Sequence, residues 1–481
     1  MSCKDYLESL HLRVEKSKAR GRFLVTSEPI PAGTTILTCK PLSFAISNDK
    51  QNNVCCNCYR VLPKLSACSK CNYAHYCCRQ CQVADWKNHK KECSWMKKLV
   101  DRKMPMNSCV IVVRMLYQIC THEVVHSFEN GVMTGDYTDI LDHCDNLNLT
   151  EESIRKGYEE VAAIIYDVVK DEPWYKEDVC PVSVITACIS RMYNNRFSVM
   201  DFENTEIAVG LYPIAYLINH RCMPNATFVF DGVTLQLRST SDIHRNEEIN
   251  ISYIDIAKPT FIRNKILKDG YGFRCNCPLC KNLQRDKELY SFKCRCGGAM
   301  LPTIEDGSKR PELWKCEKCG KEGYFADEYR IIEDEQCYSL LIWLQTDDGG
   351  YSYKHACELF KEYKEKCTED NFLFIKLLQY LLTYFIAMKR AAECEEICGI
   401  LLRFMNKFQV HNSRALLQEY ISFGKLDKGL GKHSSALKYY GTALEIARIT
   451  DGENSPIYNV VKGLMADVDF AYNGKAQKVV H

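Results

Sequence analysis

The sequence predicts a multidomain α+β protein, and three observations lead to this prediction. The chain has 481 residues, more than one core of ordinary size accommodates, so we expect roughly two to four domains. Apolar and polar residues alternate in two stretches, 10–46 and 205–256, as they do in β-strands. Residues 106–196 and the chain from about 333 onward carry apolar residues at helical spacing instead. Strand-rich and helical parts therefore occupy different regions of the chain.

The strand-rich stretches are divided by turn signals. Prolines and a glycine break residues 10–46 into short segments. Further along, ATFVF and VTLQLRS flank Asp231-Gly232, a pair typical of hairpin turns, and EINISYI follows. We expect a β-hairpin at this point and another strand after it.

Three segments of the C-terminal helical part resemble one another. They are YKHACELFKEY, AAECEEICGILL and HSSALKYYGTALEIA, and each places a small residue (Ala356, Ala392, Ala436) before a bulky run. The offsets of 36 and 44 residues are near the tetratricopeptide period but irregular. The pattern favours a repeat of helical hairpins, with a plain helical bundle as the alternative.

Charge and targeting signals exclude little. Lys and Arg total 63 against 61 Asp and Glu, so global charge does not favour a nucleic-acid or membrane partner. The N-terminal MSCKDYLESLHLRVEK has no apolar run or cleavage-like site, which predicts no signal peptide. We find no run of about 18 apolar residues and expect no membrane span. The expected location is the cytoplasm, the nucleus or both.

Cysteine is the unusual component, with 29 residues in the chain. Most of them fall into three groups, at 55–93, 275–280 and 294–319, and the rest are scattered singly, as small core residues are. Clustered cysteines in a long chain without a secretion signal are typically metal ligands. We therefore expect zinc rather than a disulfide framework.

The first group has the spacing of a two-zinc module. Cys55 and Cys58 form C-x2-C, Cys68 and Cys71 form a second C-x2-C, Cys77 and Cys81 form C-x3-C, and His89 and Cys93 complete the group. Zinc prefers four tetrahedral sulfur or nitrogen ligands, so eight ligands make two closed sites. A segment of this length cannot bury an adequate core, so the metal would supply the folding energy. Cys56 and Cys78 break the spacing and are not expected to be ligands.

This spacing, with Tyr76, Trp86 and His89, resembles the MYND zinc finger. The resemblance implies interleaved sites, and it implies proline-rich or other peptide ligands for the finger. Residues 55–93 carry seven Lys or Arg against two acids, a net charge of +5, which indicates either a contact face for protein or DNA or a solvated surface. The implied ligand sets are Cys55, Cys58, Cys77 and Cys81 for one zinc, and Cys68, Cys71, His89 and Cys93 for the other.

A second resemblance involves the strand-rich stretches. Asn219-His220, Cys222 and Pro224-Asn225, followed by the Glu248 region and Tyr253, resemble the central part of a SET domain. ARGRFLVTSEPIPAGTTI resembles its opening strand and glycine turn. With the finger between these halves, the whole chain is similar to the SET and MYND family of protein lysine methyltransferases. The implied domains are 1–50, N-terminal part of the SET domain; 51–97, MYND-type zinc finger; 98–190, helical SET insert; 191–258, SET core; 259–285, post-SET zinc segment; 286–332, an additional zinc-ribbon-like insert; and 333–481, a helical TPR-like C-terminal domain.

The resemblance implies methyl transfer from S-adenosylmethionine to lysine side chains of histone or non-histone proteins. The attacking amine must be neutral, although free lysine has a pKa of about 10.4. A narrow apolar channel lowers that pKa, and aromatic walls tolerate a cation. The candidate channel residues are Phe197, Tyr253, Tyr271 and Phe273, with the Tyr253 hydroxyl orienting the amine; alone, Tyr253 would be an ordinary strand residue.

Cofactor contacts are also implied by the resemblance. Arg20, Gly21 and Arg22 would lie near the methionyl carboxylate, and Phe273 would stack on adenine. The other implied cofactor-binding residues are Asn219, His220, Asn195, His143 and Tyr253. The chain departs from the family at two positions, where Phe23 replaces a usual glycine and Arg221 replaces a usual small residue. Either bulky side chain could crowd the cofactor and reduce activity.

The remaining cysteines predict further metal sites. Cys275, Cys277 and Cys280 leave zinc one ligand short, and the resemblance implies Cys222 as the fourth. KCRCGG and WKCEKCG supply Cys294, Cys296, Cys316 and Cys319 as two knuckles, a set that the family resemblance does not cover. We expect three to four zinc ions in all.

Two other functions are alternatives to the enzyme. A catalytically weak adaptor would bind partners through the finger and the helical repeat, and Phe23 and Arg221 favour it. A sequence-specific DNA-binding factor is disfavoured because nothing supplies a recognition helix with base-reading side chains. Nucleic-acid binding is therefore expected to be weak at most.

Overall fold

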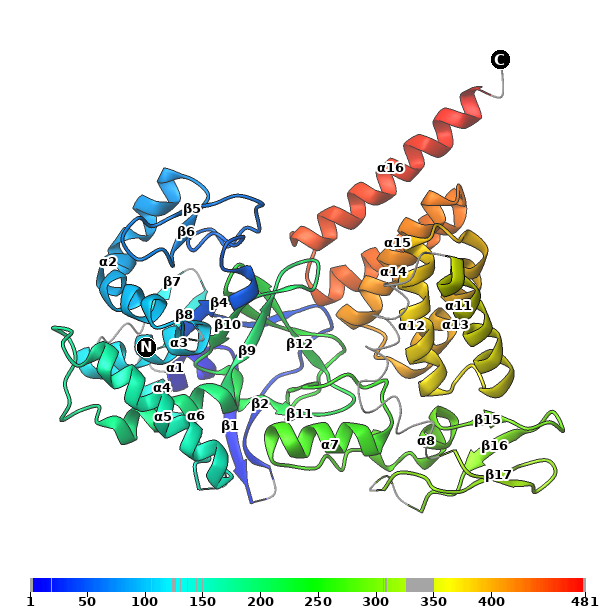
Figure 1. The fold of residues 1–481 in the computed structure, drawn as a ribbon, viewed down its shortest axis with the longest axis horizontal. Helices are drawn as coiled ribbons and strands as arrows, with labels where there is room; N and C mark the ends of the chain where they lie inside the picture. The colour runs from blue at the N-terminus through cyan, green and yellow to red at the C-terminus, as the bar shows by residue number, and fades with distance from the viewer. Residues whose placement is uncertain are drawn as a thin grey trace. The chain divides into compact units, whose positions relative to one another are not determined.

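The computed structural model describes residues 3–478 except 19, 105, 123–126, 130, 136, 144, 149, 306, 308 and 326–349 (Figure 1). These residues divide into two compact units. The first unit comprises Met1–Asn219, Asn225–Asn250 and Ile449–Ile457. The second comprises His220–Pro224, Ile251–Arg448 and Tyr458–His481.

The first unit contains a local hairpin and two larger sheets that join distant parts of the chain. β1 (Leu12–Ser17) and β2 (Gly21–Thr26) form an antiparallel hairpin. β4 (Ser43–Ile46), β10 (Glu206–Leu211) and β9 (Phe197–Met200) form a sheet in the order β4-β10-β9. A five-stranded sheet has the order β12-β13-β3-β8-β7. Its strands are β12 (Ala226–Asp231), β13 (Thr234–Ser239), β3 (Thr35–Cys39), β8 (Val132–Thr134) and β7 (Ser127–Glu129).

These sheets confirm the expected α+β fold with a split β-rich domain. β3 and β4, from the first 50 residues, pair with β13 and β10, from beyond residue 200. The predicted hairpin joins β12 to β13, and Gly232 takes a φ of +57° there, a conformation that glycine adopts without strain. The intervening residues 51–195 are therefore an insertion between the two halves of one β-rich domain.

Helices of the first unit occupy most of that insertion, and Figure 1 shows α5 and α6 side by side. α3 is buried along much of its surface and contacts β4 and α6. The insert is not wholly helical, because the β7–β8 hairpin adds two strands to the five-stranded sheet. The helices are α1 (Cys3–Ser9), α2 (Arg79–Asp101), α3 (Met106–Thr121), α4 (Tyr137–Asp142), α5 (Glu152–Val169) and α6 (Val182–Asn195), with short 3₁₀ turns at Asn48–Lys50 and Ala215–Leu217.

The second unit begins with helices and a small sheet. α7 (Thr260–Tyr271), the 3₁₀ turn Pro278–Lys281 and α8 (Leu283–Leu289) precede four short strands. These strands pair antiparallel in chain order: β15 (Phe292–Lys293), β16 (Ala299–Pro302), β17 (Trp314–Cys316) and β18 (Glu322–Gly323). β11 (Asn219–His220) and β14 (Asn250–Ile251) form a further two-stranded sheet, along which the chain passes from one unit to the other.

The helical C-terminal part consists of successive long helices, and α11–α14 lie beside one another in Figure 1. The small residues Ala356 and Ala436 are fully buried, as the repeat pattern requires. In α13, however, Ala392 is exposed and Cys394 takes the buried position, so the offsets become 38 and 42 residues. Part of the predicted domain, 333–349, lies outside the described residues. The helices are α11 (Gly350–Lys366), α12 (Phe372–Ala387), α13 (Ala391–Phe408), α14 (Arg414–Gly429), α15 (His433–Thr450) and α16 (Pro456–Lys478).

A helix that crosses a membrane must be both long and apolar. Within the described ranges, none combines the length and the apolar character needed to cross a bilayer.

Candidate metal centres and candidate active site

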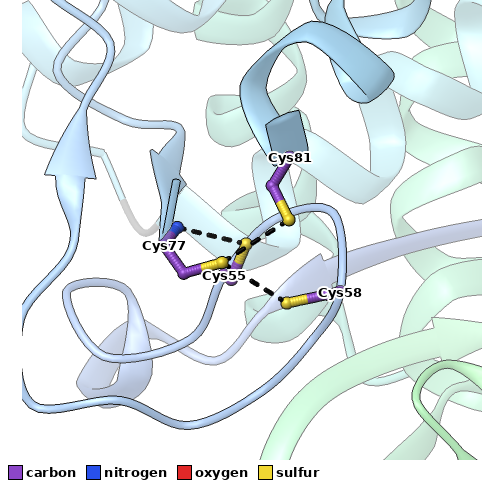
Figure 2. Close-up of side chains that lie close together, drawn as sticks. All are labelled: Cys55, Cys58, Cys77 and Cys81. Carbon is purple, nitrogen blue, oxygen red and sulfur yellow. Dashed lines mark hydrogen bonds between the residues drawn. The ribbon is translucent and has the colours of Figure 1, made fainter. Parts of the chain in front are cut away.

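The first metal centre lies in the finger and consists of four cysteines (Figure 2). Cys55 and Cys58 come from one loop, Cys77 follows β6 (His75–Tyr76), which pairs with β5 (Ser66–Ala67), and Cys81 lies in the first turn of α2. The Cys77 Sγ atom lies 3.7 Å from Cys58 Sγ and 3.5 Å from Cys81 Sγ. Tetrahedral zinc with bonds of about 2.3 Å separates its sulfur ligands by about 3.8 Å. The four thiols therefore fit a single zinc ion.

The second metal centre is interleaved with the first. Cys68 Sγ lies 3.8 Å from Cys93 Sγ, and Cys71 Sγ lies 3.6 Å from His89 Nε2. His89 and Cys93 are four residues apart on α2, so they face the same side of the helix. All four residues are buried. The two ligand sets are those that the resemblance implied, and Cys56 and Cys78 belong to neither.

The third metal centre belongs to the second unit. Cys222 Sγ lies 3.9 Å from Cys275 Sγ and 3.6 Å from Cys280 Sγ, and Cys277 Sγ lies 3.8 Å from Cys280 Sγ. The ligand atoms lie within 4.8 Å of one another. Cys222 thus supplies the fourth ligand that the C-x-C-x2-C segment lacked. This centre joins positions more than 50 residues apart in the chain.

A buried arginine lies beside this third centre. Arg263 on α7 has no solvent exposure, and its Nη2 donates to Thr260 Oγ1 at 2.8 Å and lies 3.5 Å from Cys280 Sγ. The Asp286 carboxylate attracts the Arg263 guanidinium as well. Zinc with four thiolates carries a net charge of −2, so a bound metal would add a second counter-charge beside this guanidinium. Arg263 was not among the residues predicted from the sequence.

The fourth group, Cys294, Cys296, Cys316 and Cys319, also brings its ligand atoms within 4.8 Å of one another. Its Sγ pairs lie 3.7 Å apart (Cys294 and Cys319) and 3.5 Å apart (Cys296 and Cys316). All four predicted groups can therefore hold a metal ion.

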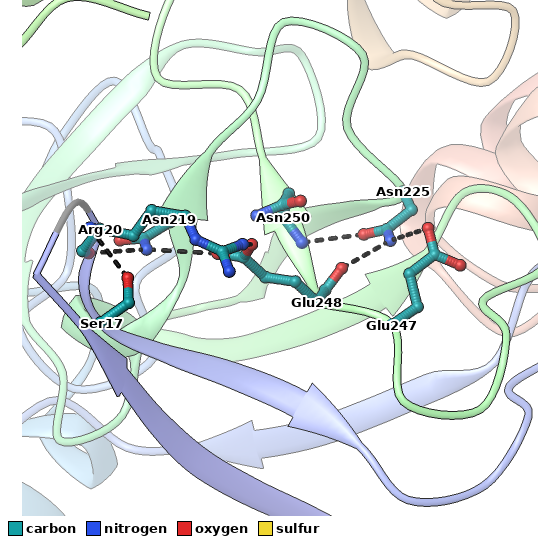
Figure 3. A network of polar contacts seen from close by, with 7 residues as sticks. All are labelled: Ser17, Arg20, Asn219, Asn225, Glu247, Glu248 and Asn250. Carbon is teal, nitrogen blue, oxygen red and sulfur yellow. Dashed lines mark hydrogen bonds and ion pairs between the residues drawn. The ribbon is translucent and has the colours of Figure 1, made fainter. Parts of the chain in front are cut away.

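A set of polar contacts, here called the polar group, surrounds the β1–β2 turn of the first unit (Figure 3). It consists of Arg20, Asn219 and Glu248. Arg20 pairs with the Glu248 carboxylate, and its backbone N–H donates to Ser17 Oγ at 3.1 Å. Asn219 Nδ2 donates to Arg20 O at 3.2 Å and to Glu248 Oε1 at 3.3 Å. Asn219 thus holds both members of the ion pair. Glu248 lies in the region that resembles a SET domain, although it was not among the predicted site residues.

Phe23, the first departure from the family, has a defined place beside the polar group. It is 4 % exposed in β2, and the Arg20 guanidinium carbon lies 4.2 Å from its ring centroid. Phe23 therefore belongs to the core of the first unit and supports Arg20 by a cation–π contact. For the second departure, the Arg221 N–H donates to Ile251 O at 2.9 Å, and its side chain is half-buried.

Gly21 and Arg22 continue the turn. Gly21 has a φ of +66°, and a Cβ atom there would meet nothing within 4 Å, so backbone conformation explains the glycine. Arg22 Nη1 lies 2.5 Å from Asp142 Oδ2, which also accepts from the Tyr216 hydroxyl at 2.7 Å. Asp142 and Tyr216 were not predicted, although Asp142 directly precedes the predicted His143.

His143 is 4 % exposed and offers an unused acceptor. Its Nδ1 lies 2.6 Å from Asp139 O and so carries the proton. Burial lowers the pKa of His143 to about 4, so the ring is neutral near pH 7. Its Nε2 is buried and has no hydrogen-bond partner among the described residues. A buried acceptor of this kind suits a ligand that donates a hydrogen bond.

The second unit contains an aromatic group, consisting of His220, Tyr253, Tyr271 and Phe273. The Tyr253 ring centroid lies 4.8 Å from that of Tyr271 and 5.4 Å from that of His220, and His220 and Phe273 are 6.1 Å apart. Tyr271 is 46 % exposed and Phe273 is 36 % exposed. These two rings therefore keep free surface for a ligand.

His220 connects the aromatic group to the third metal centre. Its Nδ1 accepts from the Tyr253 N–H at 3.0 Å, and its Nε2 lies 3.2 Å from Cys222 Sγ. Because Nδ1 accepts, a neutral His220 carries its proton on Nε2 and donates it to the Cys222 sulfur. A metal bound by Cys222 would thus fix the ring that holds the backbone of Tyr253.

The remaining predicted residues, Phe197 and Asn195, lie in the first unit. Phe197 contacts Phe228 and Tyr212, with ring centroids 5.2 and 6.1 Å away. The Asn195 side chain at the end of α6 donates to Arg191 O at 2.7 Å. These contacts of Phe197 and Asn195 lie within the first unit.

Comparisons with known proteins agree with this geometry. The SET domain family model matches residues 21–254, which include the finger as an insertion. Histone-lysine N-methyltransferase SMYD3 of Homo sapiens is 29 % identical over 314 residues, covering 64 % of this chain and 70 % of the relative. N-lysine methyltransferase SMYD2-A of Danio rerio is 24 % identical over 459 residues, covering 94 % and 97 % of the two chains. Histone-lysine N-methyltransferase ASHR1 of Arabidopsis thaliana is 23 % identical over 464 residues, covering 94 % of each.

The fold and the cysteine groups thus define a SET-domain protein with a zinc-finger-like insertion. The chain belongs to the SET and MYND family of protein lysine methyltransferases.

Proposed function

We propose that this protein transfers the methyl group of S-adenosylmethionine to lysine side chains of histone or non-histone proteins. The observation that carries the proposal is the aromatic group, in which the Tyr253 ring contacts both His220 and Tyr271. The relatives named as lysine methyltransferases support the same activity.

S-adenosylmethionine would supply a methyl group activated by a sulfonium sulfur. The lysine amine forms the new N–C bond while the S–C bond breaks, and the methylated ammonium later loses its extra proton to solvent. Rings of Tyr253, Tyr271 and Phe273 favour the neutral amine before transfer and tolerate the cation after it. The Tyr253 hydroxyl orients the amine lone pair, so rate is gained by alignment.

Each group offers what one part of the cofactor requires. In the polar group, the half-exposed Arg20 suits a carboxylate, and Glu248, only 14 % exposed, suits an ammonium. The buried Nε2 of His143 accepts a hydrogen bond from a ligand N–H or O–H. In the aromatic group, the open face of Phe273 suits adenine stacking. The residues present fit the cofactor.

We further propose zinc in both finger centres and in the Cys222 centre. Thiolate and imidazole ligands in closed, tetrahedral sets favour zinc, and such sites are structural. The two finger centres would fold a segment with little core of its own. The Cys222 centre would support the aromatic group through His220.

Isothermal titration with S-adenosylmethionine tests cofactor binding. Wild-type protein should bind, and Arg20→Ala should bind roughly tenfold to a hundredfold more weakly, because a charged hydrogen bond contributes about 1.5–3 kcal/mol. Arg13→Ala removes an arginine from the same hairpin that pairs with Glu15, and it should bind as wild type does. Absence of heat from the wild type would contradict the proposal and favour the adaptor.

An adaptor role of the finger is a second candidate because α2 exposes apolar side chains. Val83 is 63 % exposed and Trp86 is 52 % exposed, on a segment with a net charge of +5. Such a surface suits a proline-rich or acidic peptide. Alanine at Val83 and Trp86 should abolish peptide binding while leaving methyl transfer to a small substrate unchanged; loss of both would contradict separate roles.

A further inference from the structure

The fourth cysteine group sits in residues 292–325, here called the ribbon, which comprises β15–β18. Its four ligand atoms lie within 4.8 Å of one another, and its Sγ distances of 3.5 and 3.7 Å match the edge of a zinc tetrahedron of about 3.8 Å. These distances are far beyond the 2.05 Å or so of a disulfide bond. The geometry therefore fits a four-sulfur cage.

Both halves of the ribbon have the backbone turns of metal-binding knuckles. Gly297 and Gly320 follow the cysteine pairs with φ of +80° and +71°, and their N–H groups donate to Cys294 O at 2.9 Å and to Cys316 O at 3.0 Å. The Cys319 N–H donates to Cys316 Sγ at 3.5 Å. A Cβ on Gly298 would lie 3.1 Å from Cys316 Sγ. Glycines thus let two short turns close around one point.

The apolar core of the ribbon is small. Phe292 and Trp314 are fully buried, and Phe325 stacks on Phe292 with ring centroids 4.0 Å apart. Two of its strands have only two residues each. Segments below about 40 residues rarely fold on apolar burial alone. A metal ion is the component that would make this ribbon stable.

The ribbon is attached to the start of α12 by a chain of hydrogen bonds. Asn371, fully buried, donates from Nδ2 to Ser291 O at 2.6 Å, and its Oδ1 accepts from the Phe374 N–H at 3.2 Å as the N-cap of α12. Ser291 Oγ lies 2.5 Å from Thr368 Oγ1. One side chain thus joins the residue preceding β15 to the first turn of α12.

We propose that Cys294, Cys296, Cys316 and Cys319 bind a zinc ion whose function is to anchor the helical C-terminal part through Ser291 and Asn371. This function is independent of methyl transfer and of the three other metal centres. Metal binding folds the ribbon, and Trp314 of the folded ribbon donates from Nε1 to Tyr290 O at 2.7 Å. Tyr290 holds the next residue, Ser291, in place, and Ser291 O accepts from the amide that caps α12. The helices that follow would therefore depend on a metal ion that none of them binds.

Elemental analysis and hydrogen exchange of the full-length protein test the proposal. The double variant Cys316→Ser, Cys319→Ser should lose one zinc ion relative to wild type, and amides of 372–378 should exchange roughly tenfold faster or more. Cys357→Ser, a change to a half-buried cysteine of α11 outside every ligand group, should retain all metal and exchange normally. Exchange within 55–93 should be unchanged in both variants.

A second variant separates metal binding from anchoring. Asn371→Asp keeps an oxygen to cap α12 but removes the N–H that reaches Ser291 O. It should retain every zinc ion, yet exchange at 372–378 should rise about threefold to tenfold, the effect of one hydrogen bond. This variant remains informative if the double cysteine variant fails to fold.

Several results would overturn the proposal. An unchanged zinc count in the double cysteine variant would exclude a zinc site in the ribbon. Iron bound to these four cysteines in the wild type would likewise contradict zinc as the metal. A metal-free wild-type ribbon with a mass lower by four hydrogens would show two disulfides instead. Loss of zinc with unchanged exchange at 372–378, or unchanged exchange in Asn371→Asp, would leave a metal site without the anchoring function.

Discussion

The polar group of the first unit and the aromatic group of the second differ in whether their side chains already have interaction partners. Arg20, Asn219 and Glu248 bind one another, so each charge already has a partner. Tyr271 and Phe273 instead expose over a third of their surface. A ligand must compete with an ion pair in the polar group, whereas it gains contact area in the aromatic group. Under the proposed function, the polar group would therefore serve cofactor binding alone, whereas the aromatic group would also serve the transfer.

The two groups also differ in what supports them. The polar group is held by hydrogen bonds between the Asn225 side chain and the backbone. Asn225 Nδ2 donates to Glu248 O at 2.9 Å, and its Oδ1 accepts from the Asn250 N–H at 2.8 Å (Figure 3). The aromatic group rests on His220 and, through it, on Cys222. Loss of metal should therefore affect the aromatic group far more than the polar group.

The largest effect is expected from Tyr253→Phe, which removes only a hydroxyl. If the aromatic group performs the transfer, turnover should fall roughly 10²–10⁴-fold, as is typical on losing one well-placed polar group. Cofactor affinity should change little, because the ring remains. Single-turnover rates with labelled cofactor, beside titration of the same samples, measure both. Equal turnover in wild type and variant would show that another tyrosine orients the amine, and Tyr271→Phe would then be the variant to compare.

A smaller effect is expected from Arg263→Leu, which removes the cation beside the third metal centre. Zinc affinity there should fall roughly tenfold to a hundredfold, as on removing an outer partner of a metal ligand, and a chelator should extract one zinc ion faster than from wild type. Arg285→Leu is the matched control, since this second buried arginine donates to Ile256 O and Phe408 O rather than to sulfur. Cys277→Ser should abolish binding at this centre altogether. Faster extraction of every zinc ion by the same factor would contradict a specific role for Arg263.

The smallest effect is expected in the pH dependence of stability, and it involves His143 of the first unit. Its folded-state pKa of about 4 lies below the unfolded value of about 6.5, so the unfolded state binds the proton more tightly. Its contribution to stability is full above pH 6.5 and declines as pH falls toward 4, by about 2 kcal/mol between pH 7 and 5. Urea unfolding of His143→Gln across that range should show a correspondingly flatter pH dependence. An identical slope would mean that His143 is not buried as a neutral ring.

Local spacing explains how much of this molecule the sequence could predict. The eight finger ligands fit within 39 residues, and the hairpin at Asp231-Gly232 depends on adjacent residues, so both could be predicted from local spacing. The division of those ligands into two interleaved centres required the family resemblance. The Cys222 centre required the family resemblance, because its ligands are more than 50 residues apart. The β7–β8 hairpin has a local signal, the Asn-Gly pair at 130–131, although apolar spacing over residues 106–196 predicts helices there.

Other features could not be predicted from spacing. The Arg20–Glu248 ion pair joins residues 228 positions apart, and Arg263 looks in sequence like any surface arginine of a helix. The repeat pattern predicts Ala392 at the buried position of α13, whereas Cys394 is buried there. Two small residues within one helical turn cannot be distinguished from sequence when the element that packs on them is unknown. Tertiary contacts, rather than local preference, decide each of these cases.

Methyl transfer itself tests the central claim most directly. Wild-type protein, isotopically labelled S-adenosylmethionine and a protein extract should give labelled lysine residues detectable by mass spectrometry, and the Tyr253→Phe variant should give far fewer. A wild type that binds the cofactor by titration yet labels no lysine in any protein would contradict the account and leave the adaptor as the function.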